Sequence, residues 1–79
     1  MNRRKLRDPR IVFGQTLKRF RLRKGFSQEE LADLAGIHRT YVGDVERGTR
    51  NIALLNMTRL AQALGLSLSR IIEEMESHQ

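Results

Sequence analysis

The residues of this chain that could do chemistry concentrate in one short run, His38-Arg39-Thr40-Tyr41. An arginine can donate two parallel hydrogen bonds to O6 and N7 of guanine, and a threonine can bond a base while its methyl group packs on thymine. A tyrosine offers its hydroxyl to a phosphate and its ring to a base. An ordinary exposed helix would more often carry Glu and Lys here. The run therefore predicts recognition of DNA.

Two of these side chains also have a simpler interpretation. Arg39 could clamp a phosphate, which would add affinity without sequence information. Tyr41 could be a half-buried aromatic residue at the edge of the core. His38 flanks the same surface of the expected helix.

Five more candidate DNA-binding residues follow within ten positions: Gly43, Asp44, Arg47, Arg50 and Asn51. Glycine inside a helix costs up to about 1 kcal/mol relative to alanine. We expect Gly43 to let the backbone approach the groove or to leave space for Arg39. Asp44 could accept from cytosine N4, orient Arg47 or repel misplaced phosphates, and a solvated acid remains an equal alternative. Phosphate contact is the default role of the other three, and Arg50 could also reach a base.

The sequence offers no comparable arrangement for catalysis or metal binding. His38 and His78 are far apart and lack a set of partner ligands, and the chain has no cysteine. The serines at 27, 67 and 69 lack a nearby base, and no glycine-rich phosphate loop occurs. We therefore expect no enzyme activity, no catalytic residue, no metal and no cofactor.

The elements that must position the candidate residues are two short helices. Ser27 followed by Glu30 is a capping box, which starts a helix over about 28–34. Gly36 stands where the chain turns, and a second helix runs from about His38 to the residue before Gly48. This pattern predicts a helix-turn-helix whose second helix enters the major groove of DNA.

Three further helices complete an all-α, five-helix prediction. Pro9 and Gly25 bound a first helix over about 9–24, Gly65 ends a fourth that includes Leu54, and Ser67 starts a fifth. We expect the last two helices to bury six apolar side chains internally: Leu54, Met57, Leu60, Leu64, Leu68 and Ile71.

Charge divides the chain unevenly. Residues 1–25 hold ten Lys and Arg against one acid, whereas residues 27–79 hold five Arg against eight acids, for a net charge of +6 over 79 residues. Residues 1–8 are expected to form a basic flexible arm and residues 9–79 the DNA-binding and dimerisation domain. The arm suits a polyanionic partner, although a solvated tail remains an alternative. The sequence has no signal peptide or apolar run of about 20 residues, so we expect a cytoplasmic protein.

Several motifs together resemble the lambda-repressor-like, Xre-type helix-turn-helix family. The matching residues are Arg21, Gly25, Ser27-Gln28, Leu31-Ala32, Gly36-Ile37, His38-Arg39-Thr40-Tyr41, Glu46-Arg47-Gly48, Leu60-Ala61 and Ala63-Leu64-Gly65. Arg39-Thr40-Tyr41 followed by Arg50-Asn51 is similar to the controller proteins of restriction–modification systems.

The resemblance implies further roles. Gln28 would contact a DNA phosphate and brace the recognition helix, and Arg21 would form a structural ion pair with Glu46. The chain departs from the family pattern at Ile52 and Ala53, where many members carry proline and then serine or threonine. The fourth helix therefore lacks the usual side-chain cap.

An apolar strip of Leu55, Ile72 and Met75 is the candidate dimer interface, and its alternative role is to complete the core. A homodimer would place two recognition helices about 34 Å apart on a pseudo-palindromic operator. The expected partners are double-stranded DNA, a second copy and, as a further candidate, RNA polymerase, with no membrane. An antitoxin or prophage-type repressor is an alternative of the same fold, and a non-catalytic protein-interaction module with a basic arm is an alternative of another class.

Overall fold

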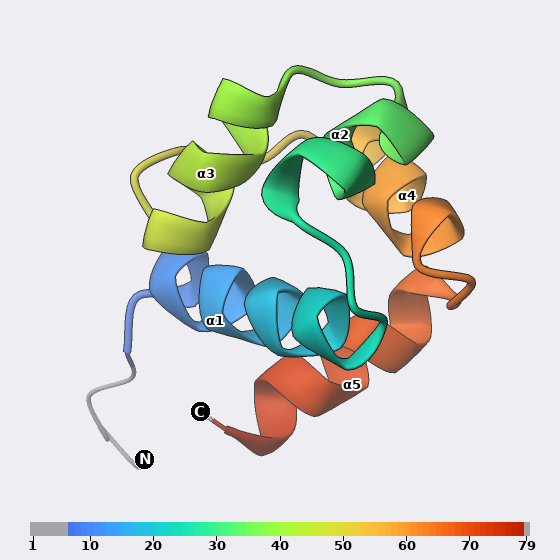
Figure 1. Ribbon diagram of the computed structural model, residues 1–79. Coiled ribbons are helices and arrows are strands. Elements are labelled where there is room, and N and C mark those ends of the chain that lie inside the picture. Colours follow the sequence, from blue (N-terminus) through green and yellow to red (C-terminus); the bar gives the residue numbers. More distant parts are fainter. Residues whose placement is uncertain (1–6, 79) are drawn as a thin grey trace, which may run out of the picture.

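Five α-helices run through residues 7–78, the part of the chain that the computed structural model describes (Figure 1). They are α1 (Pro9–Arg23), α2 (Gln28–Ala35), α3 (Arg39–Arg47), α4 (Leu54–Ala63) and α5 (Leu68–Ser77). No strand occurs in this range, and the predicted all-α, five-helix class is confirmed. Most of the predicted basic arm, residues 1–6, lies outside the described residues.

Local side-chain chemistry explains where α2 and α3 begin and end. Ser27 and Glu30 form the reciprocal capping box at the start of α2. Gly36 ends α2 with a φ of 71°, a left-handed conformation that side chains with a Cβ disfavour. At the start of α3, His38 Nδ1 accepts a hydrogen bond from the backbone N–H of Thr40 at 3.1 Å. This imidazole cap was not predicted from the sequence.

Side-chain caps also start α1 and α5, whereas α4 lacks one. The carboxylate of Asp8 caps α1 by accepting from the Arg10 N–H, and Ser67 caps α5. Ala53 precedes α4 and offers no side-chain cap, as the sequence predicted.

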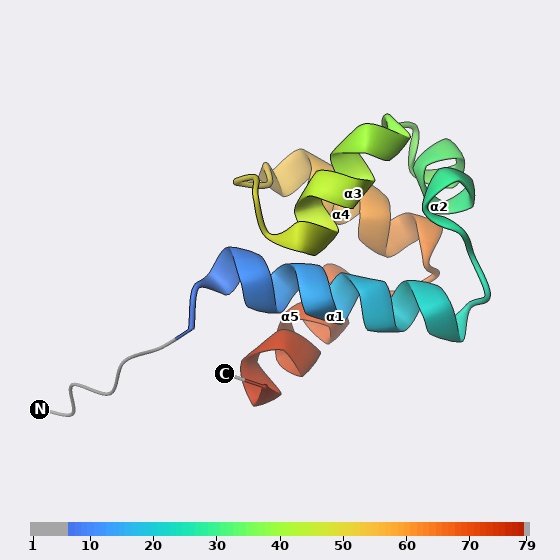
Figure 2. The ribbon, with the colours of Figure 1, turned by 60° about the vertical axis from the view of Figure 1, so that its left-hand side comes forward.

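Helix α1 lies between α3 on one side and α5 on the other, as both ribbon views show (Figures 1 and 2). Helix α4 packs against α2 and α5. The approach of α1 to α3 depends on Gly14, because a Cβ there would collide with the carbonyl oxygens of Val45 and Glu46. The absence of a side chain at Gly14 therefore lets α1 and α3 pack closely.

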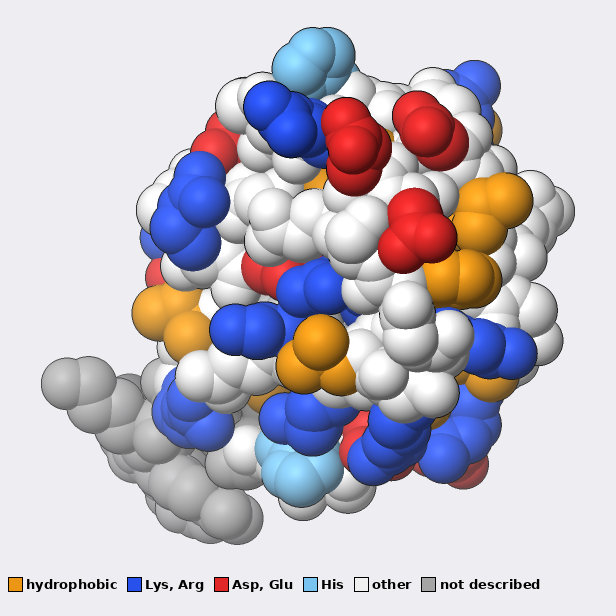
Figure 3. Space-filling model, viewed as in Figure 1, with side chains coloured by type: hydrophobic (Ala, Val, Ile, Leu, Met, Phe, Trp, Pro, Cys, Tyr) orange, Lys and Arg blue, Asp and Glu red, His pale blue; other side chains and the backbone are white. Residues whose placement is uncertain are grey.

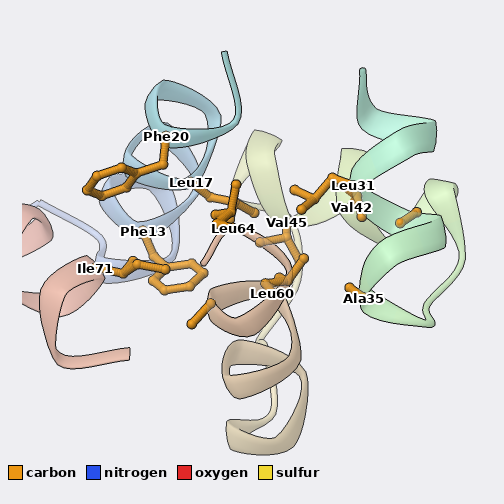
Figure 4. Packing of buried hydrophobic residues seen from close by; sticks show 12 residues of the cluster. Phe13, Leu17, Phe20, Leu31, Ala35, Val42, Val45, Leu60, Leu64 and Ile71 are labelled. Carbon is orange, nitrogen blue, oxygen red and sulfur yellow. The ribbon is translucent and has the colours of Figure 1, made fainter. Parts of the chain in front are cut away.

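Every helix contributes to one hydrophobic core, whose side chains point toward one another in Figure 4. The core residues labelled there are Phe13, Leu17, Phe20, Leu31, Ala35, Val42, Val45, Leu60, Leu64 and Ile71. Met57 and Leu68 are partly buried against this core. Leu54 was wrongly predicted to be internal: it is 68% exposed, because it is the first residue of α4 and the packing of that helix begins further along it.

Candidate nucleic-acid interface

A buried polar network fixes α3 to the rest of the domain. Arg21 Nε lies 2.6 Å from Glu46 Oε2 and its Nη2 lies 3.0 Å from Oε1, so the pair is bidentate. The two side chains are only 8% and 3% exposed. Arg21 Nη1 also donates to the carbonyl oxygen of Phe26, and its hydrogen bonds to Glu46 raise the pKa of the Arg21 guanidinium. One ion pair thus connects α1, the loop before α2 and α3.

Gln28 belongs to the same network. Its Nε2 donates to Glu46 Oε1 at 3.0 Å, so the first residue of α2 is tied to the penultimate residue of α3. A primary amide carries two N–H donors, and this bond uses one of them. The other takes no part in the bond to Glu46. Motif matching suggested the bracing role of Gln28 but not its attachment to Glu46.

An open hollow of about 600 Å³ lies between the start of α2 and the outer side of α3. Its lining residues are Arg21, Ser27, Gln28, Glu29, Arg39, Thr40, Gly43 and Arg47. Half of the ten DNA-binding residues predicted from the sequence therefore lie around one hollow: Gln28, Arg39, Thr40, Gly43 and Arg47. The N-terminal N–H groups of a helix and nearby arginines favour an anion such as a DNA phosphate.

Gly43 forms part of this hollow, but its environment differs from the prediction. It is buried, and a Cβ there would lie 3.2 Å from Arg47 Nη1 and 3.5 Å from Gln28 Oε1. The side chain that Gly43 makes room for is therefore Arg47, together with Gln28. The expectation that it leaves space for Arg39 is corrected, since Arg39 is not among the nearest neighbours of such a Cβ.

The N-terminal end of α3 is open to solvent. His38, Arg39 and Thr40 are all exposed. The nearest acidic partner of Arg39 is Glu29, whose carboxylate lies 3.8 Å away with both side chains 67% exposed. Exposed pairs of this kind contribute about 0–1 kcal/mol, so Arg39 can leave Glu29 at little cost when another acceptor is offered.

The C-terminal end of α3 carries more side-chain interactions than the N-terminal end, because Asp44 accepts hydrogen bonds from two arginines. Arg47 donates to its Oδ1, and Arg50 donates to its Oδ2 at 2.8 Å. The Arg50 guanidinium also lies over the partly buried ring of Tyr41, 4.9 Å from its centroid. The hydrogen bond from Arg50, reinforced by the charge of Arg47, lowers the pKa of Asp44. Asn51 follows this cluster and is exposed.

Figure 3 shows how charge is distributed on this side of the molecule. Lys and Arg side chains spread over α1 and the adjoining part of α3, whereas acidic side chains gather over α2. The surface is therefore polarised, with its basic side chains over α1 and the adjoining part of α3 and its acidic side chains over α2. Such a distribution orients a polyanion on the protein rather than only attracting it.

The three predicted dimer residues differ in exposure. Leu55 is 60% exposed at the start of α4. Ile72 and Met75 are partly buried and line an apolar groove of about 230 Å³, together with Phe13, Ile52 and Met57. An exposed leucine and an apolar groove are thus available to a second copy.

Other kinds of site find no support in residues 7–78. That range contains no cluster of three or more His, Cys, Asp or Glu side chains able to hold a metal ion. Nor is any helix within it long and apolar enough to cross a lipid bilayer.

Comparison with known proteins agrees with this geometry. The sequence profile described as helix-turn-helix matches residues 17–71. The chain is 43% identical over 65 residues to control protein C.BamHI of Bacillus amyloliquefaciens, covering 81% of this chain and 80% of that protein. It is 36% identical over 72 residues to control protein C.MunI of Mycoplasma sp, covering 90% and 97%. The crystal structure of the restriction–modification controller protein C.AhdI of Aeromonas hydrophila is similar with a TM-score of 0.77 and 48% identity, over 78% of this chain and 94% of that one.

Proposed function

The chain belongs to the helix-turn-helix family of DNA-binding transcription regulators, and we propose that it is a homodimeric controller of a restriction–modification operon. It would act without catalysis, in the cytoplasm, by occupying a pseudo-palindromic operator. Two copies related by a two-fold axis would place their α3 helices about 34 Å apart in successive major grooves. The named relatives support the controller role.

The observation that carries the proposal is the arrangement of α3: an inner side braced by Arg21, Glu46 and Gln28 and an outer side of exposed donors. A recognition helix must be held rigidly while its outer side chains remain free to meet base edges. Arg39 and Thr40 are assigned to bases. We assign the phosphate contacts to five residues: Gln28, His38, Tyr41, Arg47 and Asn51. Gly43 leaves the space that the Arg47 side chain occupies.

The dimer is assigned to the exposed Leu55 and to the groove that Ile72 and Met75 line. A single small module buries too little surface for tight operator binding, so a second copy is physically expected. Leu55→Glu should give a monomer in sedimentation experiments with an unchanged fold, because the side chain is 60% exposed in the single chain. A Leu55→Glu protein that remains dimeric would exclude Leu55 from the interface.

The test of operator binding starts from duplexes selected out of a random pool by the full chain. The expected result is a two-fold symmetric site, bound about 10³-fold or more tightly than random duplex, with an affinity that falls steeply with salt. Equal binding to every duplex, or none, would instead favour the protein-interaction module. Deletion of residues 2–7 should reduce the salt dependence if the basic arm contacts phosphates.

The controller role is tested by the position of the operator in the genome. A site upstream of the chain's own gene, beside genes for a methyltransferase and an endonuclease, is the expected result. A site within prophage genes or a toxin–antitoxin pair would favour the alternative repressors. Pull-down of RNA polymerase on operator DNA tests the further partner, with non-operator DNA as the control.

A further inference from the structure

Resting on the proposed function, we infer that Asp44 is a positioning residue that increases operator specificity by holding Arg47 and Arg50 in a fixed arrangement. Each oxygen of its carboxylate accepts from one of the two arginines. In this role Asp44 contacts neither a base nor a phosphate. Its effect on DNA passes through the two guanidinium groups.

Relative exposure separates this role from direct reading of cytosine. The side chain of Asp44 is 20% exposed, whereas those of Arg47 and Arg50 are 63% and 48% exposed. The carboxylate therefore lies beneath the guanidinium groups, and a duplex approaching this surface meets the arginines first. A cytosine amino group would have to pass these guanidinium groups before it could reach the carboxylate.

The main chain around Asp44 strengthens the arrangement. Its carbonyl oxygen accepts from both the N–H and the hydroxyl of Thr49, each at 3.1 Å. The loop after α3 is thus attached to Asp44 at two points. Thr49 donates to the backbone carbonyl oxygen of Asp44, and Arg50 donates to its carboxylate. The ring of Tyr41 supports the Arg50 guanidinium from another direction, at 4.9 Å from the ring centroid.

Fixing two arginines changes the balance between operator and random DNA. An unrestrained arginine can reach whichever phosphate is nearest, so it strengthens binding to every duplex alike. An arginine held by a carboxylate makes its full set of hydrogen bonds only where the duplex presents acceptors at matching positions. The negative charge of Asp44 also penalises phosphates that approach in the wrong register.

The test compares Asp44→Asn with the wild-type full chain on the selected operator and on random duplex, over a range of salt concentrations. Asparagine keeps the size of the side chain and removes its charge. Random-duplex affinity should rise about fivefold, the effect of one unit charge near a phosphate in water. The salt slope on random duplex should steepen by about 0.9 for each additional phosphate that the freed arginines neutralise. The preference for the operator should fall about tenfold, because Arg47 and Arg50 lose the fixed orientation that matches the operator.

Glu73→Gln is the matched control, since it removes one exposed negative charge from α5, on the far side of α1. Asp44→Glu retains the charge and should keep most of the operator preference. An Asp44→Asn protein that loses affinity for both duplexes by the same factor, with an unchanged salt slope, would overturn the inference. So would a Glu73→Gln protein with the same rise in affinity for random duplex.

The wild-type measurements separate this inference from the proposed function. A wild-type chain without preference for any duplex overturns the proposed function, and with it the specificity role. A wild-type chain that prefers its operator, combined with an unaltered preference in Asp44→Asn, overturns only the role of Asp44. Thermal unfolding of each variant identifies any loss of the folded state.

Discussion

The inner and outer sides of α3 each carry an arginine–carboxylate interaction, and the two differ in burial. On the inner side, Arg21 and Glu46 are 8% and 3% exposed and share two hydrogen bonds. On the outer side, Asp44 is 20% exposed and its arginines are about half exposed or more. Removing one partner of a buried pair leaves an uncompensated charge, whereas an exposed pair contributes little to stability. The inner interaction holds α3 against the rest of the domain. The outer interaction holds the two arginines that are exposed to solvent.

The difference between the two sides predicts the largest effect at Glu46. Glu46→Ala should lower the free energy of unfolding by about 3–5 kcal/mol, because Arg21 is left buried without its carboxylate and Gln28 loses its acceptor. Denaturant titration measures the change. On the outer side, Asp44→Ala provides the contrast and should change stability far less, because an exposed ion pair contributes little. Equal losses of unfolding free energy in Glu46→Ala and Asp44→Ala would mean that the difference in burial between the two ion pairs has no effect on stability.

The second effect concerns the contact that holds the inner side of α3 against α1. Gly14→Ala should cost about 1–3 kcal/mol of unfolding free energy, because the added methyl group meets backbone carbonyl oxygens that cannot rotate away. The neighbouring Gln15 is exposed on the same helix, so Gln15→Ala is the control and should change stability by less than about 0.5 kcal/mol. A Gly14→Ala chain as stable as the wild type would show that α1 and α3 can separate without penalty.

The third effect concerns the outer side of α3, where a substitution should weaken operator binding without changing stability. Arg39→Ala should leave thermal unfolding unchanged, since the side chain is 67% exposed, and should weaken operator binding by about 1–3 kcal/mol. Binding to operators substituted at single base pairs distinguishes the two roles of Arg39. If Arg39 reads a guanine, the variant loses discrimination at one position only. Uniform weakening on every sequence would instead make Arg39 a phosphate clamp.

The contrast between the two sides also explains what could be predicted from the sequence. The helices followed from Ser27 with Glu30, from Gly36 and from the apolar spacing, because caps and periodicity are local properties. The fit of Gly14 against α3 and the attachment of Gln28 to Glu46 join segments distant in the chain, so no local pattern contains them. Leu54 was misplaced because periodicity does not reveal where along a helix its packing begins.

The outer side was predicted by residue type, and of its arrangement only the contact between Asp44 and Arg47 was among the alternatives. The sequence named Asp44, Arg47 and Arg50 as candidates with several roles each, and their shared hydrogen bonds depend on how the loop after α3 turns back. Tyr41 was open between a DNA contact and a core-edge residue, and it is partly buried beneath Arg50. These contacts depend on a loop conformation, which amino-acid type alone does not reveal.

The smallest effect is expected at His38, where the two sides meet at the start of α3. Its Nδ1 serves the helix by accepting from the Thr40 N–H, while the ring remains exposed to any DNA partner. His38→Ala should lower the free energy of unfolding by about 0.5–1 kcal/mol through loss of the cap, and His38→Asn should restore it, because the Asn side chain is a good cap. Operator affinity of His38→Asn then isolates the DNA contact. If His38→Asn regains stability but not affinity, the imidazole meets DNA through its other nitrogen. If it regains both, the contribution of His38 is confined to the helix, and the outer side of α3 begins at Arg39.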